Sequence, residues 1–159
     1  TKIGFKYIAE IIQEGGVLVG GEESGGISVA GHIPERDGIW NGLVLLEFMA
    51  KSGKTLKELV AEVYNIVGTF GFHRIDLTLP EAQKLAIVEQ CKNGEFTAFG
   101  PYTVQRVDTL DGFKYMLSDD EWVMIRPSGT EPVLRTYAEG ASVDAAKAIL
   151  EATHRVILA

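Results

Sequence analysis

The chain has 159 residues, of which 46% are hydrophobic and 23% are charged, the proportions of a soluble globular protein. Its formal net charge of −7 argues against nucleic acid or an anionic membrane as a partner, because both attract a basic surface. No apolar run reaches the length of a membrane span, no signal peptide is visible, and the single cysteine, Cys91, fits a cytoplasmic protein. The chain starts at Thr1 and enters a helical pattern at once, so we expect a piece of a longer protein.

The first part of the chain alternates helical patterns with short apolar runs. Apolar residues at three- and four-residue spacing predict a helix over 4–14. The apolar run 17–19 predicts a buried strand that opens into a glycine-rich loop, and a second short strand is expected over 27–30. The glycine-rich loop therefore lies between two expected strands.

Two further helices are expected before a boundary near residue 68. The first runs over 37–50 from Asp37 as its N-cap, and its spacing predicts an inward apolar face at Ile39, Leu43, Leu46 and Met49. A capping box at Thr55 starts the second, which continues to about residue 66. The glycines that follow predict two units, 1–68 and 69–159.

The second unit has a different pattern. Alternating polar and apolar residues over 74–79 predict a half-buried strand, and Pro80 opens a helix that runs to about Cys91. Ser142 caps a last helix, and four more strands are expected between the two helices, near 102–107, 112–117, 121–126 and 132–138. This order predicts a small α+β domain whose helices lie on one face of an antiparallel sheet.

The most informative segment is the loop 126–132, which reads Arg-Pro-Ser-Gly-Thr-Glu-Pro and is followed by Arg135. Guanidinium groups meet phosphate oxygens bidentately, and hydroxyls and backbone N–H groups take the remaining lone pairs. The hydroxyls of Ser128 and Thr130, and a backbone that Gly129 frees, complete such a set. A β-turn with exposed arginines is the alternative, and the two arginines favour binding of a doubly charged phosphate.

A second loop, 20–26, carries two adjacent carboxylates and Ser24 among four glycines. A carboxylate such as that of Glu22 accepts hydrogen bonds from two neighbouring sugar hydroxyls, and Ser24 adds a polar contact. A divalent-metal site built from Glu22, Glu23 and Asp37 fits the same spacing, as does a solvated acidic loop. From the residues alone, all three interpretations of this loop stay open.

The sequence shows no recognisable nucleophile. No serine lies in a Gly-x-Ser-x-Gly motif, and there is no Walker loop. His32, His73 and His154 share no metal-ligand spacing, while Lys6 and Arg36 are weaker binding candidates. The chain has groups that bind a ligand without groups that react with it.

Three motifs, in this order, resemble the α-D-phosphohexomutases, the family of phosphoglucomutases and phosphomannomutases. They are Gly4-Phe5-Lys6, Gly21-Glu22-Glu23-Ser24-Gly25 and the loop 126–132, with a softer match over 32–38. The resemblance covers essentially the whole chain. It implies the α/β C-terminal part of the family's third domain over 1–68. Over 69–159 it implies the fourth domain, an α+β fold like that of the TATA-box-binding protein.

The resemblance also implies a reaction. In this family a phosphoserine gives its phosphoryl group to a hexose phosphate, and the resulting 1,6-bisphosphate turns around and returns the other phosphoryl group. Mg²⁺, held by an aspartate-rich loop of another domain, neutralises the transferring group. The expected parent is therefore a cytoplasmic isomerase of carbohydrate metabolism, a phosphoprotein with glucose 1,6-bisphosphate as its intermediate.

The family's site positions transfer to this chain residue by residue. Its sugar-binding positions fall on Glu22 and Ser24, which would hold the hydroxyls at C3 and C4. Lys6 matches an active-site lysine of the family. The positions that hold the non-reacting phosphate share one strand–loop–strand segment and fall on Arg126, Ser128, Gly129, Thr130 and Arg135.

The chain departs from the family in what it lacks. The serine nucleophile loop and the Asp-Gly-Asp magnesium loop are absent, so no mutase activity is expected without the N-terminal domains of the same protein. The strand edges near 17–19 and 27–30 are expected to drive self-association or disorder. The Glu-Glu-Ser loop favours glucose or mannose over glucosamine. A free-standing phosphosugar-binding module without catalytic domains is the alternative.

Overall fold

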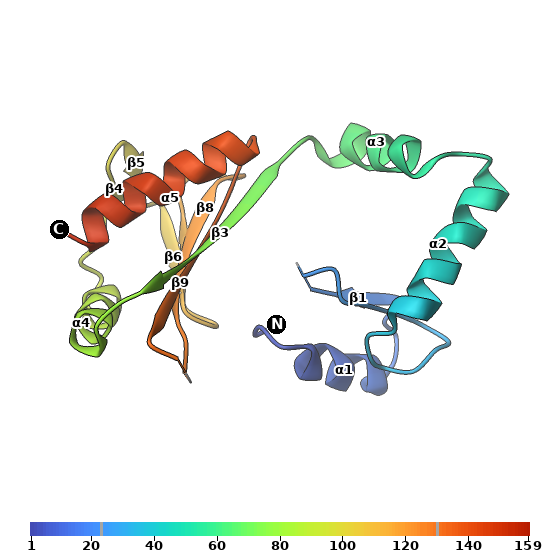
Figure 1. The fold of residues 1–159 in the computed structure, drawn as a ribbon, viewed down its shortest axis with the longest axis horizontal. Coiled ribbons are helices and arrows are strands. Elements are labelled where there is room, and N and C mark those ends of the chain that lie inside the picture. Colours follow the sequence, from blue (N-terminus) through green and yellow to red (C-terminus); the bar gives the residue numbers. More distant parts are fainter. Residues whose placement is uncertain (23, 130) are drawn as a thin grey trace. The chain divides into compact units, whose positions relative to one another are not determined.

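The computed structural model describes residues 1–22, 24–129 and 131–159 and divides into two compact units (Figure 1). The N-terminal unit is Thr1–Val67 and the C-terminal unit is Gly68–Ala159. Each strand pair of the described residues lies within one unit, so each unit carries its own sheet.

The N-terminal unit combines helices with one short antiparallel sheet. Its elements in chain order are α1 (Phe5–Glu14), β1 (Val19–Gly21), β2 (Ile27–Val29), α2 (Gly38–Ser52) and α3 (Leu56–Val67). The predicted helix over 4–14 is confirmed, and Gly15 is its C-cap. β1 and β2 pair antiparallel, so the glycine-rich loop between them is the connection of a hairpin.

The expected buried strand over 17–19 is wrong in position and in burial. β1 begins at Val19, and Leu18 and Val19 are 80% and 62% exposed. α1 packs against β1, but a sheet of two strands presents too little surface to bury every apolar side chain that flanks it. Self-association through this edge stays a prediction.

The predicted inward face of α2 is also wrong. Ile39, Leu43 and Leu46 are 82%, 56% and 61% exposed, Met49 is half-buried, and α2 has no buried residue. An apolar stripe is buried only where another element packs against it, and β2, which contacts α2, leaves these three side chains exposed. The predicted N-cap is confirmed, because Asp37 Oδ1 accepts hydrogen bonds from the N–H groups of Ile39 and Trp40, each at 3.0 Å. Local signals therefore set this helix.

The C-terminal unit is a five-stranded antiparallel sheet with two helices and a small hairpin. Its order along the sheet is β3-β9-β8-β7-β6, and β4 pairs with β5. The elements are β3 (Gly71–Thr78), α4 (Glu81–Lys92), β4 (Ala98–Phe99), β5 (Tyr102–Thr103), β6 (Arg106–Asp108), β7 (Phe113–Met116), β8 (Trp122–Pro127), β9 (Val133–Gly140) and α5 (Val143–Ile157). The predicted cap of α5 is confirmed, because Ser142 Oγ accepts from the N–H of Ala145 at 3.1 Å.

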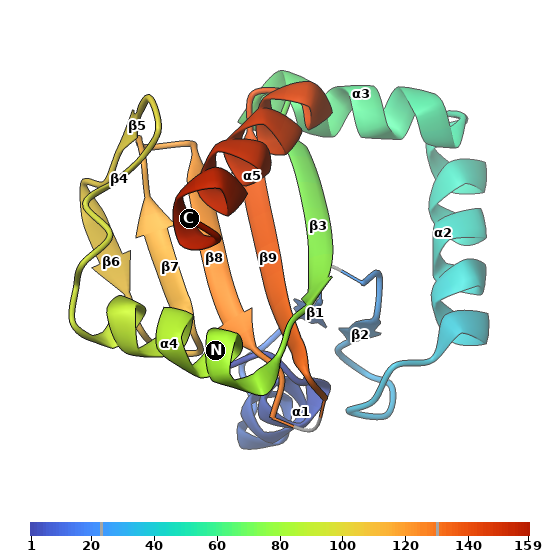
Figure 2. The same ribbon diagram turned by 60° about the vertical axis from the view of Figure 1, so that its left-hand side comes forward.

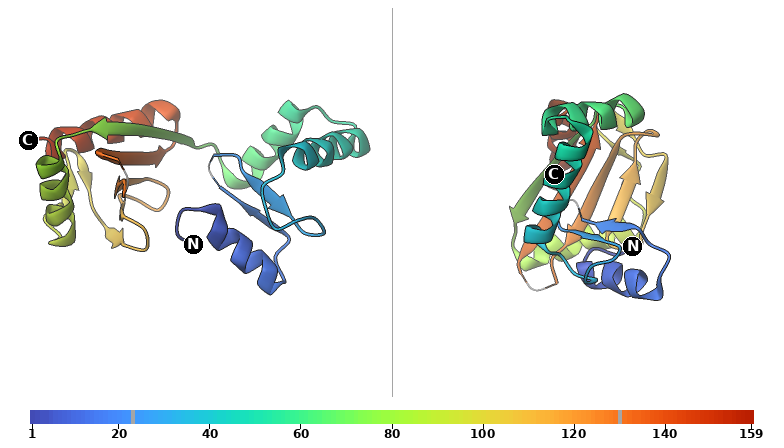
Figure 3. Two further views of the ribbon diagram at one scale, coloured as in Figure 1. Left: turned by 60° about the horizontal axis from the view of Figure 1, so that its bottom comes forward. Right: turned by 90° about the vertical axis from the view of Figure 1, so that its right-hand side faces the viewer.

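Alternation along the strands gives this sheet a covered face and an open face. Side chains on the covered face form one core with both helices. The sheet contributes Val123, Ile125, Leu134 and Ala138, α5 contributes Ile149, and α4 contributes Ile87. α5 packs against β3, β8 and β9, and α4 lies on the same side of the sheet (Figures 2 and 3). The predicted antiparallel sheet with helices on one face is confirmed. Among the described residues, no helix is long and apolar enough to cross a membrane.

The start of β3 and the start of α5 approach so closely that only glycine fits between them. Gly71 is buried and pairs with Gly140 on β9. A Cβ at position 71 would lie 2.0 Å from both the carbonyl carbon of Ser142 and the nitrogen of Val143. Both atoms belong to the backbone, which has no rotamer through which to yield. This glycine therefore sets how closely the last helix approaches the edge strand.

His154, on the covered face, makes the stability of this unit depend on pH. Its Nε2 donates to the Thr136 hydroxyl at 2.9 Å, which donates in turn to the carbonyl of Ile75 at 2.9 Å. Burial lowers the pKa of His154 below its usual 6.5, although Glu151 opposes this. Because the unfolded chain binds the proton more readily, the folding free energy is fully present above about pH 6.5 and falls as the pH drops through that value.

This dependence is measured by urea unfolding of the protein at a series of pH values from about 8 to about 5.5. The free energy of unfolding should decrease toward the acidic end. His154→Gln keeps an N–H donor for Thr136 but cannot titrate, so it should flatten the profile. An unchanged profile in this variant would assign the dependence to another group.

Candidate functional site

Two arginines lie directly opposite one another on the open face of the C-terminal sheet. Arg126 near the end of β8 pairs in register with Arg135 near the start of β9. Directly opposed residues of an antiparallel pair point to the same face, with Cβ atoms about 4.5–5.5 Å apart. Two like charges so placed repel one another, and the structure shows carboxylates that offset this.

Asp111 holds the first arginine. Its Oδ1 lies 3.3 Å from Nε of Arg126, and both side chains are partly buried. Gly112, at φ 91°, makes the turn that brings Asp111 back to β8. A Cβ at Gly112 would lie 2.9 Å from the carbonyl oxygen of Ile125, so the turn is specific to glycine.

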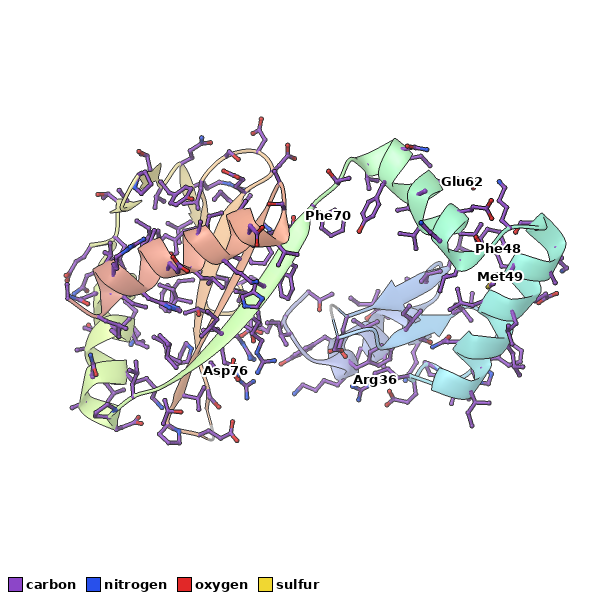
Figure 4. All side chains as sticks on the ribbon, turned by 45° about the horizontal axis from the view of Figure 1, so that its top comes forward. Arg36, Phe48, Met49, Glu62, Phe70 and Asp76 are labelled. Atoms are coloured by element: carbon purple, nitrogen blue, oxygen red, sulfur yellow. The ribbon has the colours of Figure 1, made fainter. Side chains whose placement is uncertain are left out.

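Arg135 is held from two sides. Its Nη2 donates to Glu131 Oε2 at 3.1 Å, and its Nε lies 3.9 Å from Asp76 Oδ2 on the neighbouring strand β3 (Figure 4). Asp76 accepts from Arg74 at 2.7 and 2.6 Å, and this contact holds the pKa of Asp76 below its usual value. Arg135 Nε is buried and has no hydrogen-bond partner among the described residues.

The loop between the two arginines is partly buried. Ser128 is 7% exposed, and its N–H donates to the carbonyl of Val133 at 2.9 Å. Gly129 is exposed and its φ is not positive, so this glycine does not shape the loop through a left-handed conformation, and its role in turning N–H groups inward stays a prediction. The loop reaches its conformation with ordinary φ values at the residues described. Thr130, the remaining predicted phosphate contact, lies outside the described residues.

The hairpin loop of the N-terminal unit is closed by its own backbone. The N–H of Glu22 donates to the carbonyl of Gly26 at 2.9 Å, and that of Gly25 donates to the carbonyl of Glu22 at 3.0 Å. The Glu22 side chain is 13% exposed, while Ser24 is exposed. Glu23 lies outside the described residues.

Arg36 reaches this loop from the segment that precedes α2 (Figure 4). Its Nη1 lies 3.4 Å from Glu22 Oε2, and its guanidinium carbon lies 5.1 Å from the centre of the Phe5 ring. A Cβ at Gly26 would lie 2.5 Å from Cδ of Arg36. The absence of a side chain at Gly26 therefore makes room for the arginine that orients Glu22.

Gly26→Ala should push Arg36 away from Glu22 and lower the affinity of this loop for a sugar about three- to tenfold. The variant loses the charge-assisted contact between Arg36 and Glu22. The effect is modest because the Arg36 side chain is more than half exposed, and solvent weakens such a contact. Gly38→Ala is the steric control, because a Cβ there meets nothing within 4 Å and the residue has no positive φ. Isothermal titration with a hexose phosphate measures both variants. Equal affinity of the Gly26→Ala variant and the unmodified protein would contradict this role of Gly26.

Of the two weaker candidates, Arg36 takes part in these contacts, whereas Lys6 makes a different one. Lys6 is exposed and places its Nζ 4.7 Å from the centre of the Tyr7 ring. His32 stacks on Trp40 with ring centres 4.4 Å apart, and its Nε2 lies 2.8 Å from Asp37 Oδ2. Asp37 caps α2 through its other oxygen, so both of its carboxylate oxygens have partners within the chain. The described residues contain no group of three or more His, Cys, Asp and Glu side chains placed to hold one.

Sequence reasoning missed Lys84, which is 7% exposed and lies beside the 126–132 loop. Its Nζ contacts the carbonyl of Glu131 at 3.3 Å and the carboxylate of Glu81 at 2.9 Å. A lysine in an amphipathic helix is ordinarily assigned to the solvent face. Nothing in the pattern of α4 marks this one as different.

Models of a single family match both units. The α/β/α domain III of phosphoglucomutase/phosphomannomutase matches residues 1–67, and the C-terminal domain of phosphoglucomutase/phosphomannomutase matches residues 75–156. The order of the two matches is that of the family's domains. The chain therefore belongs to the phosphoglucomutase/phosphomannomutase family, the α-D-phosphohexomutases.

Relatives in this family carry more than one name. A phosphoglucomutase/phosphomannomutase of Thermococcus kodakarensis is 34% identical over 151 residues, which are 95% of this chain and 31% of that protein. A phosphoglucosamine mutase of Methanococcus aeolicus is 37% identical over 156 residues, 95% of this chain and 32% of that protein. The chain thus spans about a third of the length of these relatives.

Solved structures agree with the family. A protein of Thermus thermophilus assigned as a phosphomannomutase matches with a TM-score of 0.76 and 34% identity, over all of this chain and 31% of that one. The phosphoglucomutase parafusin of Paramecium, in an open form, also gives a TM-score of 0.76, at 22% identity, over 99% of this chain and 33% of that one. At that identity, the second match concerns the fold alone.

Proposed function

We propose that this chain is the C-terminal part of a phosphoglucomutase/phosphomannomutase that interconverts the 1-phosphate and 6-phosphate of a hexose. In this proposal the C-terminal unit binds the phosphate that is not reacting, and the hairpin loop of the N-terminal unit binds the sugar hydroxyls. The observation that carries the proposal is the register pairing of Arg126 with Arg135 on the open face of the sheet.

The paired arginines suit a phosphate dianion. Each guanidinium group can offer two parallel N–H donors to a phosphate, and the two side chains leave neighbouring strands on the same face. Three carboxylates, those of Asp111, Asp76 and Glu131, hold the arginines before a ligand arrives. We assign Ser128, Gly129 and Thr130 to the same phosphate through their hydroxyls and N–H groups.

The division of roles follows from the reaction. A bisphosphate that binds in two opposite orientations can place either phosphate on the same arginine pair. The hydroxyls at C3 and C4 exchange places under that rotation, so Glu22 and Ser24 can serve both orientations. Glucose and mannose differ in the configuration at C2, and in this proposal no residue contacts the C2 hydroxyl in both orientations. We therefore propose a substrate range that includes both hexoses.

The reacting groups are assigned to domains outside this chain. The proposed enzyme uses a phosphoserine and Mg²⁺, which neutralises the transferring phosphoryl group when it is bound, and glucose 1,6-bisphosphate is the proposed intermediate. The residues of this chain would fix the sugar and the spectator phosphate so that the other phosphate meets the serine. Location in the cytoplasm and self-association of the isolated chain remain predictions.

The test is made in two steps. The reading frame around this chain is first sequenced for a serine nucleophile loop and an Asp-Gly-Asp loop upstream, and the complete protein is assayed with glucose 1-phosphate and mannose 1-phosphate. Conversion to the 6-phosphates, dependent on Mg²⁺, supports the proposal. A complete protein that binds hexose phosphates without converting them would instead favour a phosphosugar-binding module.

The isolated chain tests the division between the loops. It is titrated with glucose 1,6-bisphosphate without Mg²⁺ while backbone amide shifts are recorded. Shifts at Gly129 and at Gly21 and Gly25 would support both assignments. Shifts at Gly129 alone would mean that only the phosphate-binding loop binds the ligand in the isolated chain. An absence of shifts at all three glycines would contradict ligand binding by the isolated chain.

A further inference from the structure

Lys84 is a buried cation that the proposed reaction does not use. It is the fourth residue of α4, and its side chain is only 8% exposed. Lysine is almost never buried to this extent unless its ammonium group is paired, because burial removes the charge from water. Its position therefore requires partners, and the structure provides two.

The first partner is the phosphate loop itself. Nζ of Lys84 donates to the backbone carbonyl of Glu131 at 3.3 Å. Beside it, the N–H of Leu79 donates to the carbonyl of Pro132 at 3.3 Å. The junction of β3 and α4 thus binds two consecutive carbonyls on the limb of the loop that leads into β9.

The second partner is Glu81, one turn earlier on α4, whose carboxylate lies 2.9 Å from Nζ. Glu81 is 58% exposed, so it compensates the charge from the solvent side while Nζ stays against the loop. Two contacts of Nζ, one with the Glu131 carbonyl and one with the Glu81 carboxylate, therefore fix the direction of the Lys84 side chain. A surface lysine with an ordinary i,i+3 pair has no such second contact.

We propose that Lys84 is a positioning residue for the phosphate-binding loop. It fixes the Glu131 carbonyl and thereby the part of the loop that leads into β9, and it adds a buried positive charge beside the loop. This inference rests on the proposed function, because the loop is taken to bind phosphate. Lys84 itself is not proposed to touch the substrate.

The chain contains a matched control for this residue. Lys92, on the same helix, also pairs with a glutamate three residues earlier, Glu89, at 3.5 Å. Its side chain is 59% exposed and lines a hollow with Asp111 and Arg126, so this control carries a charge near the site but not the contact with the Glu131 carbonyl. Lys84→Met and Lys92→Met therefore remove the same charge and the same type of pair from one helix, but only the first removes the contact with the Glu131 carbonyl.

The experiment uses the complete mutase with glucose 1-phosphate as the probe. The Lys84→Met variant should raise the KM and the inhibition constant of inorganic sulfate about tenfold, with kcat changed less than threefold, because uniform binding of the spectator phosphate is lost. The Lys92→Met variant should change each constant less than threefold. Equal losses in both variants would overturn the proposal, as would an unchanged KM in the Lys84→Met variant.

A measurement on the unmodified protein covers the case in which Lys84→Met does not fold. With ¹⁵N-labelled lysine side chains, the ammonium signal of Lys84 should shift when glucose 1-phosphate is added and that of Lys92 should not. No shift at Lys84 while the sugar phosphate binds would overturn the positioning role. An unmodified protein without binding or conversion of glucose 1-phosphate would instead overturn the proposed function.

Discussion

Replacing Arg126 by alanine is expected to weaken binding of a hexose phosphate about thirty- to a hundredfold. The change removes a bidentate, charge-assisted contact of about 1.5–3 kcal/mol. It also leaves the partly buried Asp111 without the guanidinium that lies 3.3 Å away. Without Arg126 to offset it, the negative charge of Asp111 beside the site repels a phosphate dianion, so the loss of affinity should fall toward the upper end.

Isothermal titration with glucose 1,6-bisphosphate measures this effect, and a melting curve shows whether the variant is folded. Arg155→Ala is the control, since Arg155 is an exposed arginine on α5 and carries the same charge. Arg126→Ala with Asp111→Asn should recover part of the loss, because the negative charge that repels the phosphate is then removed. Similar affinities for the Arg126→Ala and Arg155→Ala variants would show that the β8 arginine does not bind the phosphate.

The largest effect on stability is expected for Gly71→Ala. The new Cβ would stand 2.0 Å from two backbone atoms at the start of α5, so β3 and the helix must move apart. We expect a loss of about 3 kcal/mol in the free energy of unfolding of the C-terminal unit, the upper range for overpacking. This loss is large against the stability of an ordinary domain.

Urea unfolding followed by fluorescence of Trp122 reports on this unit once Trp40 is changed to phenylalanine. Gly129→Ala serves as the control, because a Cβ there meets nothing within 4 Å and the residue has no positive φ. Its free energy of unfolding should stay within about 0.5 kcal/mol of the parent value. A Gly71→Ala variant as stable as this control would mean that the helix start adjusts without cost.

Signals confined to a few neighbouring residues were predicted correctly from the sequence. The capping box is one: the N–H of Thr55 donates to Glu58 at 2.8 Å, and the N–H of Glu58 donates to Thr55 at 3.4 Å. The caps at Asp37 and Ser142 are others. Alternation over 74–79 also indicated which side chains of β3 face the core, because a strand fixes the side of each residue.

Features that join distant parts of the chain could not be predicted in the same way. Asp76 meets Arg135 only because β3 pairs with β9, a pairing that no local pattern specifies. Arg36 meets Glu22 through the space that Gly26 leaves. The inward face expected for α2 failed for the opposite reason, since an apolar stripe says nothing about whether a partner surface is present.

The pairing of β3, β9 and β8 also sets the smallest piece of this protein in which the arginine pair can exist. Asp76 lies early in the sequence of the C-terminal unit, whereas Arg126 and Arg135 lie late in it. A peptide of β8 and β9 alone therefore lacks Asp76, one of the carboxylates that hold Arg135. Asp111 and Lys84 lie between them. The span Gly68–Ala159 contains all of these groups, which makes it the natural portable unit for grafting onto another scaffold.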